Sequence, residues 1–115
     1  MVAPETFFNL GSILYPILKL GQSEIIRQRR FITFFGASYD VIFDLWELIV
    51  NYLPRNRNPM HLMWTMLFLK QYNKDSTNAS VCGCDEKTFR NWVWLYLRVI
   101  SRLDFVSLFK IITFN

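Results

Sequence analysis

The sequence predicts an all-α fold, a helical bundle that contains a helix-turn-helix. Three observations predict it. Apolar residues recur at the 3.6-residue period of a helix, helix-capping residues precede these stretches, and a glycine turn precedes the last and longest of them. The chain has 115 residues, of which 52% are hydrophobic, so it can build the core of one domain and wholesale disorder is excluded.

The first 30 residues form an apolar and basic segment of uncertain origin. Residues 7–20 are largely apolar, but Pro16 interrupts them, which predicts a short helix ending near Tyr15 and a second start at Pro16. Ser23 then opens a short basic stretch. We assign residues 1–30 to this segment, residues 31–105 to a helix-turn-helix DNA-binding domain, and residues 106–115 to a tail.

A helix is predicted after Gly36. Ser38 is a good N-cap and Asp40 lies in the first turn, where the helix dipole favours a negative charge. Pro54 ends the helix. Its apolar stripe is predicted to consist of Val41, Leu45, Leu48, Ile49 and Tyr52.

The next helix is predicted to lie at the centre of the bundle. Asn58 followed by Pro59 is an N-cap with proline at the first helical position. Residues 60–72 are apolar almost all round, and a helix without a polar face is typical of a buried position.

A short helix, a turn and a long helix are predicted to follow. Residues 75–81 are small and polar around Ala79, and Gly83 between two cysteines supplies the unusual backbone angle of a tight turn. Asp85 caps a helix that runs to about Leu103. The core face of this helix is predicted to comprise Phe89, Trp92, Val93, Tyr96, Ile100 and Leu103, with Trp94 on the opposite, basic face.

This order of elements matches a helix-turn-helix, in which the last helix enters the major groove of DNA. Arginine reads guanine and asparagine reads adenine, so Arg90 and Asn91 in the first two turns are the candidates for base contacts. The candidates for phosphate contacts are Lys87, Arg98 and Arg102, and Arg55 and Arg57 are candidates for further contacts to the DNA backbone. The same periodicity also fits a bundle of three or four helices whose last helix has a solvated basic face.

Five stretches of the chain carry a resemblance to a known family. They are Phe34-Phe35-Gly36-Ala37-Ser38, Leu45-Trp46-Glu47-Leu48, His61-Leu62-Met63-Trp64, Leu67-Phe68-Leu69-Lys70 and Asp85-Glu86-Lys87-Thr88-Phe89-Arg90-Asn91-Trp92-Val93-Trp94. Together they make residues 31–105 resemble the N-terminal region of Harbinger-type DDE transposases, a branch of the DDE superfamily endonucleases. The run after Gly83 is the most specific part of the resemblance.

The resemblance implies that residues 31–105 bind double-stranded DNA, at transposon ends, in the nucleus. In that family a catalytic domain with an RNase H-like fold follows, in which three carboxylates bind two metal ions. The chain ends at Asn115, where that domain would begin, so we expect a truncated or fragmentary transposase that is not an enzyme. We expect no catalytic residue, no metal and no cofactor.

Residue counts indicate the charge of a possible partner, the cellular location and the role of the single histidine. Lys plus Arg is 13 and Asp plus Glu is 9, and the resulting net charge of +4 permits a polyanionic partner. The only cysteines, Cys82 and Cys84, are too close for an unstrained bridge, which favours a reducing, intracellular location. The single histidine, His61, is expected to be structural.

Double-stranded DNA is the expected partner, with a second copy or a missing catalytic domain as possible protein partners; no small-molecule substrate is expected. No stretch reaches the roughly 18 uninterrupted apolar residues of a spanning helix, so a membrane is not the expected partner. Two alternatives remain open. One is a non-catalytic helical protein-interaction module, because the chain is 17% aromatic. The weaker one is a membrane-surface helix over residues 7–30.

Overall fold

The computed structural model describes residues 1–20, 23–71 and 73–103. No strand occurs in these ranges, and the predicted all-α class is confirmed. The same ranges contain no helix long and apolar enough to cross a membrane. The tail predicted at residues 106–115 lies outside them. In chain order the elements are α1 (Pro4–Leu14), the 3-10 helix η1 (Pro16–Leu20), α2 (Glu24–Phe35), α3 (Tyr39–Ile49), the 3-10 helix η2 (Val50–Tyr52), α4 (Pro59–Gln71), α5 (Asp75–Cys82) and α6 (Glu86–Ser101).

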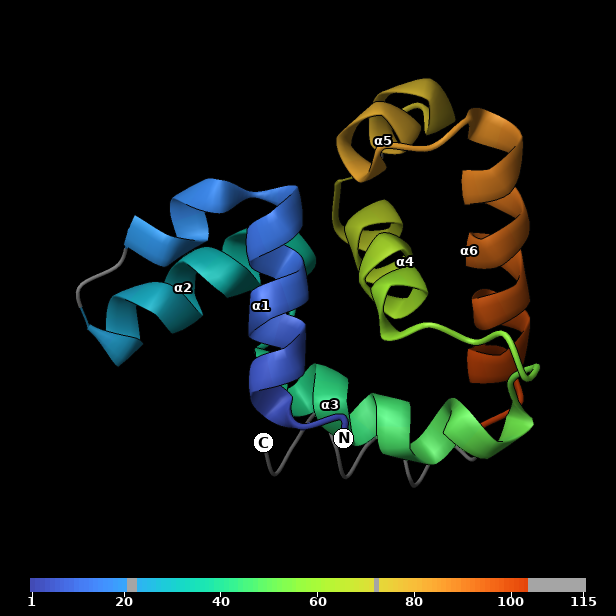
Figure 1. Ribbon diagram of the computed structural model, residues 1–115, viewed down its shortest axis with the longest axis horizontal. Coiled ribbons are helices and arrows are strands. Elements are labelled where there is room, and N and C mark those ends of the chain that lie inside the picture. The colour runs from blue at the N-terminus through green and yellow to red at the C-terminus, as the bar shows by residue number, and fades with distance from the viewer. Residues whose placement is uncertain (21–22, 72, 104–115) are drawn as a thin grey trace.

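Helix α4 lies at the centre of the fold, as its sequence predicts. It packs against α1 and α2 on one side and against α5 and α6 on the other, while α3 runs along the end of the molecule (Figure 1). Leu62, Met63 and Leu67 are fully buried, so the helix contributes to the core in several directions. The Thr65 hydroxyl is also buried, and it donates a hydrogen bond to the carbonyl oxygen of His61 at 2.9 Å.

The predicted helix starts are confirmed by their hydrogen bonds. The Ser38 hydroxyl accepts from the backbone N–H of Val41 at 3.2 Å, and the Asp85 carboxylate accepts from that of Thr88 at 2.7 Å. The Asn58 side chain does the same for Met60 at 2.9 Å. Each cap satisfies a backbone donor that has no partner inside its helix, which fixes where α3, α4 and α6 begin.

Helices α1 and α2 belong to the same core as the later helices. Phe7 and Phe31 are fully buried, and Gly11 leaves room on α1 for two aromatic rings of α2. A Cβ atom at Gly11 would lie 2.8 Å from the ring of Phe31 and 2.9 Å from that of Phe35.

The division predicted between residues 30 and 31 falls inside α2, which is one continuous helix. The break predicted near Tyr15 is present, because α1 ends at Leu14 and η1 begins at Pro16.

The apolar stripe predicted for the helix after Ser38 is wrong in register. Leu45 and Ile49 are buried as predicted, but Tyr52 is 73% exposed and Val41 is only half-buried. The ring of Phe7 in α1 lies 6.2 Å from that of Trp46, which turns the neighbouring face of α3 inward. The buried residues of α3 are therefore Tyr39, Ile42, Leu45, Trp46 and Ile49.

Candidate nucleic-acid interface

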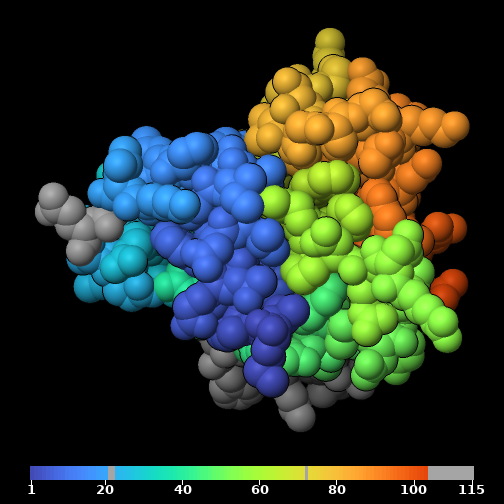
Figure 2. All heavy atoms as spheres, in the orientation of Figure 1, coloured from blue at the N-terminus to red at the C-terminus, as the bar shows by residue number. Residues whose placement is uncertain are grey.

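Helix α6 combines a buried face with a basic face. Phe89, Val93 and Tyr96 are at most 1% exposed, as the sequence predicts, whereas Trp92 and Ile100 are half-buried. The buried side chains recur at spacings of four and three residues, so they occupy one side of the helix against α4 and α5. The opposite side projects along one edge of the molecule (Figure 2).

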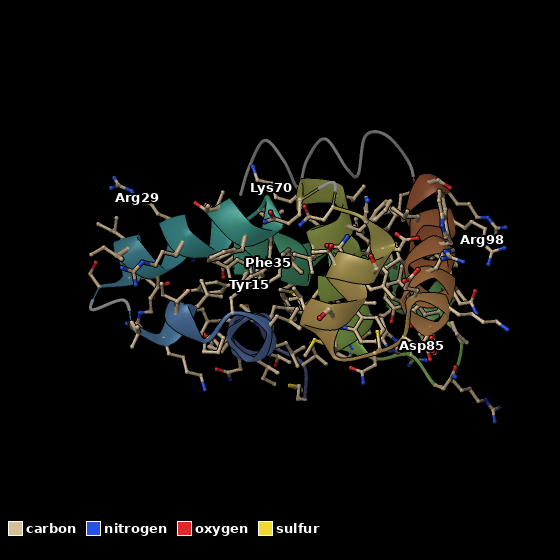
Figure 3. The ribbon with its side chains drawn as sticks, turned by 90° about the horizontal axis from the view of Figure 1, so that it is seen from above. Tyr15, Arg29, Phe35, Lys70, Asp85 and Arg98 are labelled. Atoms are coloured by element: carbon tan, nitrogen blue, oxygen red, sulfur yellow. The ribbon has the colours of Figure 1, made fainter. Side chains whose placement is uncertain are left out.

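The outward face of α6 is formed by five side chains. At about 100° per residue, Lys87, Asn91 and Arg98 fall within about 40° of one another around the helix axis. No aspartate or glutamate occurs between Lys87 and Arg102, so this face carries positive charge along its length. Figure 3 shows Arg98 pointing away from the rest of the molecule. We call Lys87, Asn91, Trp94, Arg98 and Arg102 the α6 outer face; all five are exposed.

Arg90 does not share this face. It lies about 80° around the helix from Arg98, on the side of α6 nearer to α5. Its Nε is 3.1 Å from an oxygen of Asp75 at the start of α5, and its Nη2 is 3.8 Å from an oxygen of Glu86. The side chain predicted to read bases is therefore held in an ion pair in the free protein. Asn91 makes no side-chain hydrogen bond among the described residues.

The turn between α5 and α6 has the conformation that the sequence predicts. Gly83 has a φ of +72°, in the left-handed region, and it ends α5. The backbone N–H of Cys84 donates to the carbonyl oxygen of Ala79 at 3.0 Å, which closes the turn. Ala79 is 2% exposed, so its small side chain lets α5 pack closely within the core.

The link that carries Arg55 and Arg57 lies beside the C-terminal half of α6 (Figure 1). The Tyr96 hydroxyl donates to the carbonyl oxygen of Asn58 at 2.8 Å and accepts from the backbone N–H of Asn58 at 3.2 Å. These two bonds tie the start of α4 to α6. Burial raises the pKa of Tyr96 to about 12, and the nearby positive charge of Arg57 opposes the rise. The link thus places further cations next to the part of α6 that carries Arg98 and Arg102.

Trp94 interrupts the basic face with a large apolar group. Its side chain is 53% exposed, as its position opposite the core face predicts. On one side it is backed by the ring of Phe68 in α4, with 6.3 Å between the ring centroids. The interleaving of cations with an exposed aromatic ring is compatible with both a nucleic-acid partner and a protein partner.

His61 has a structural environment, as expected. Its ring stacks on Trp92 with 4.0 Å between the centroids and also lies 4.7 Å from Trp64. Burial lowers the pKa of His61 to about 4, so the ring is neutral at pH 7. Its Nδ1 is buried without a hydrogen-bond partner in the described part of the chain. A general base needs a nearby nucleophile, and this ring faces aromatic carbon.

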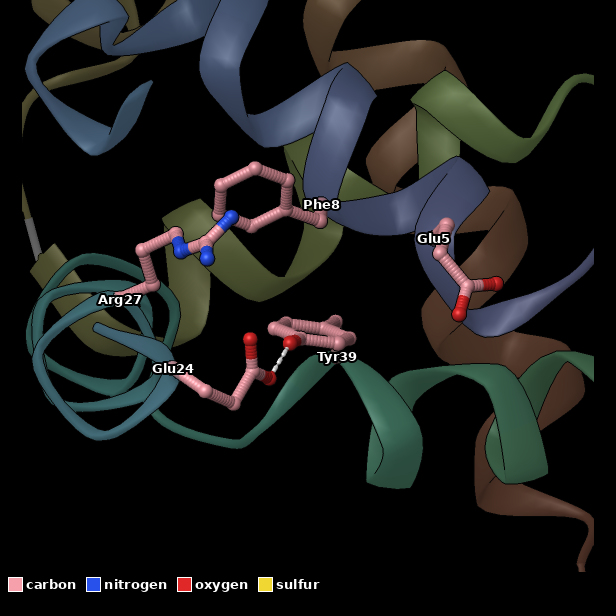
Figure 4. Close-up of a pocket in the computed structure, with 5 residues that line it drawn as sticks. All are labelled: Glu5, Phe8, Glu24, Arg27 and Tyr39. Carbon is pink, nitrogen blue, oxygen red and sulfur yellow. Dashed lines mark hydrogen bonds between the residues drawn. The ribbon is translucent and has the colours of Figure 1, made fainter. Parts of the chain in front are cut away.

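A second surface feature is a hollow of about 280 Å³ between α1, α2 and α3 (Figure 4). Phe8 and Tyr39 form its walls, and Arg27 points into it near Glu24. The Glu24 carboxylate accepts a hydrogen bond from the Tyr39 hydroxyl. Because Glu5 adds a second carboxylate to the rim, this hollow repels a polyanion more than the α6 outer face does.

The cysteines and acidic residues do not come together as a metal site. Cys82 and Cys84 are both free thiols, and burial raises the pKa of Cys82 to about 12. Within residues 1–20, 23–71 and 73–103, no three side chains among His, Cys, Asp and Glu are grouped so that they could hold a metal ion.

Comparisons with protein-family models, with curated proteins and with solved structures found no match for this chain. The resemblance of residues 31–105 to Harbinger-type transposases therefore stays a prediction, as do the DNA-contacting roles of the basic residues. The structure shows how these predicted residues are arranged. Four of the seven predicted DNA-binding residues, Lys87, Asn91, Arg98 and Arg102, share the α6 outer face. Two, Arg55 and Arg57, stand on the adjoining link, and Arg90 is paired with Asp75.

Proposed function

We propose that this protein binds double-stranded DNA with α6 in the major groove, as the DNA-binding part of a Harbinger-like transposase acting in the nucleus. One observation carries the proposal. The α6 outer face aligns three cations and one amide over about four turns, and no acidic side chain interrupts them. An α-helix fits the major groove of B-DNA, and cations along it would replace the counterions of the phosphates.

The elements that precede α6 support the same proposal. In a helix-turn-helix the last helix is presented outward by a shorter helix that packs across it behind a tight turn. Here α5 has eight residues, and the left-handed Gly83 follows it directly. Ala79 packs α5 closely into the core, on the inner side of α6. The α6 outer face is therefore left uncovered.

Each side chain has a role that follows from its position. Asn91 lies near the N-terminal end of α6 and is suited to the donor and acceptor pair of adenine. Lys87, Arg98 and Arg102 are suited to phosphates along the groove, and Arg55 and Arg57 add backbone contacts from the link. Arg90 reads guanine only after it leaves Asp75, because the ion pair occupies its Nε.

The test is a binding titration against a random duplex pool at two salt concentrations, followed by sequencing of the bound fraction. The variant K87A/R98A should bind at least about tenfold more weakly and lower the salt slope by about two, because two phosphate contacts are lost. The matched control, K19A/R29A, removes the same charge from η1 and α2 and should stay close to the wild type. Equal loss in the two variants would reduce the proposal to non-specific attraction of a basic protein.

A second candidate function is a helical protein-interaction module, which the exposed ring of Trp94 favours. The same samples distinguish it. Absence of DNA binding at low salt, together with a mass that rises with concentration and falls again in W94S, would favour the interaction module. A monomeric chain with an enriched DNA motif would exclude it.

A further inference from the structure

Helix α2 carries apolar side chains on two opposite sides. Its inner face contributes Phe31 and Phe35, which are fully buried in the core. Its opposite side carries three isoleucines that are 65%, 41% and 41% exposed. At about 100° per residue these isoleucines and one arginine span about 120° of the helix, and this group is called the α2 outer face. Its members are Ile25, Ile26, Arg29 and Ile32, and the exposed Thr33 lies within the same arc.

Two cations, Arg29 and Lys70, lie on or next to the α2 outer face. Figure 3 shows Arg29 and Lys70 pointing to the same side of the molecule, and the aliphatic part of Lys70 passes 3.5 Å from the Cβ position of Gly36 at the end of α2. The one acidic residue of α2, Glu24, is turned toward Tyr39 and accepts its hydroxyl hydrogen bond. Asp40 of α3 reaches α2 beside this face, where it accepts a hydrogen bond from the Gln28 side chain at 3.2 Å, and no ion pair of Arg29 is found among the described residues.

The exposed isoleucines and the flanking cations indicate the chemistry of a partner for this face. Exposed isoleucines on one short helix favour burial in an apolar medium, at a gain proportional to the area removed from water. The flanking cations favour a medium that is bordered by negative charge. An anionic phospholipid surface combines both, and a helix of 12 residues, about 18 Å long, is suited to lie in such a surface.

We propose that the α2 outer face docks on anionic phospholipid membranes, with Ile25, Ile26 and Ile32 entering the acyl boundary and Arg29 and Lys70 at the headgroups. This contact differs from a single amphipathic helix over residues 7–30, because Phe7 and Leu18 are fully buried and cannot reach a membrane. The contact is also independent of DNA binding, since it uses a different helix from α6.

The experiment is co-sedimentation of the full chain with vesicles of an equal mixture of phosphatidylserine and phosphatidylcholine, and with vesicles of phosphatidylcholine alone. We expect binding to the mixed vesicles that weakens with salt, and much weaker binding to phosphatidylcholine. The variant I25S/I32S should lose at least about tenfold in partitioning. The matched control is I13S/I17S, which removes two isoleucines that are 65% and 49% exposed from α1 and η1 and should behave like the wild type.

Further variants make the outcome decisive. R29E should weaken binding to the mixed vesicles, whereas K87A/R98A should leave it unchanged, which separates this contact from the DNA face. Three results would overturn the proposal: no binding by the folded chain at low salt, equal binding by wild type and I25S/I32S, or a dimer in light scattering that I25S/I32S abolishes. The last result would assign the face to a second copy of the chain. Circular dichroism of each variant ensures that a loss of binding is not a loss of fold.

Discussion

The guanidinium of Arg90 is bound to the carboxylate of Asp75 across the α5–α6 turn, with 3.1 Å between Nε and Oδ2. The side chains are 48% and 31% exposed, so the pair is screened by water and contributes at most about 1 kcal/mol to stability. The ion pair therefore matters more for where it holds the Arg90 side chain than for stability. It joins the start of α5 to the first half of α6 and holds the Arg90 side chain toward α5, away from the α6 outer face.

Removing the charge of Asp75 tests this relationship. The variant D75N should bind duplex DNA about two- to fivefold more tightly at low salt, because Arg90 is released and a nearby negative charge is lost. The control is E47Q, which removes one exposed negative charge from α3. An affinity gain in E47Q as large as in D75N would mean that net charge alone is responsible. A loss of affinity in a folded D75N would show that the ion pair organises the binding surface.

The packing of two α2 rings against α1 can be tested at Gly11. In G11A the new Cβ would meet the rings of Phe31 and Phe35 at under 3.0 Å, and Met63 lies 3.3 Å away on a third side. Alanine favours a helix over glycine by up to about 1 kcal/mol, but overpacking between buried rings costs about 1–3 kcal/mol. We expect a net destabilisation of about 1–2 kcal/mol in urea unfolding.

The control for Gly11 is N9A, an exposed position on the same helix. It should leave the free energy of unfolding unchanged or slightly raised, because alanine is the better helix former. A G11A protein as stable as N9A would mean that the rings of Phe31 and Phe35 do not pack against Gly11 as the structure has them.

The features that the sequence predicted well are those determined by neighbours in the chain. The proline after Asn58 and the glycine between the two cysteines act within a few residues, so the start of α4 and the turn at Gly83 were predicted correctly. The basic side of α6 follows from helical spacing alone. Whether that side binds DNA cannot be derived from spacing, since a solvated face has the same pattern.

The features that the sequence did not predict depend on contacts between distant elements. Apolar residues occupy most positions of α3, so periodicity left its register ambiguous, and the contact of Phe7 with Trp46 decides it. The ion pair of Arg90 with Asp75 joins residues 15 positions apart and depends on how α5 packs on α6. The exposed isoleucines of α2 lie in a stretch that mixes apolar and basic residues, so its spacing alone did not show which apolar side chains the core covers.

The left-handed conformation of Gly83 predicts that alanine and asparagine at this position destabilise the protein to different extents. Nothing lies within 4 Å of a Cβ at this position, so the backbone angle alone determines the effect of a substitution. G83A should lose about 1–2 kcal/mol of stability, whereas G83N should lose less, because asparagine tolerates the left-handed region. Urea unfolding of both variants provides the measurement. Equal stability of the wild type and G83A would contradict the observed turn.

His61 makes the stability of the protein depend on pH. Its pKa is lowered by burial to about 4, below the ordinary value of 6.5, so only the unfolded chain takes up this proton as the pH falls from 6.5 toward 4. The contribution of neutral His61 to the free energy of unfolding should therefore be fully present above pH 6.5 and be lost as the pH falls toward 4. The decline is about 1–2 kcal/mol after discounting for the solvent exposure of the half-buried ring.

The variant H61F isolates this contribution. Phenylalanine preserves the stacking on Trp92, where the centroids lie 4.0 Å apart, and it removes the proton and the unpartnered Nδ1. Urea midpoints of wild type and H61F between pH 7 and about 4 should diverge steadily, with the wild type losing more. Carboxylates such as Asp85, whose pKa is lowered by the Thr88 hydrogen bonds, titrate at the acid end in both proteins and cancel in the difference. Parallel curves for the two proteins would mean that His61 is protonated in the folded state as readily as in the unfolded chain, and that its stack on Trp92 is open to water.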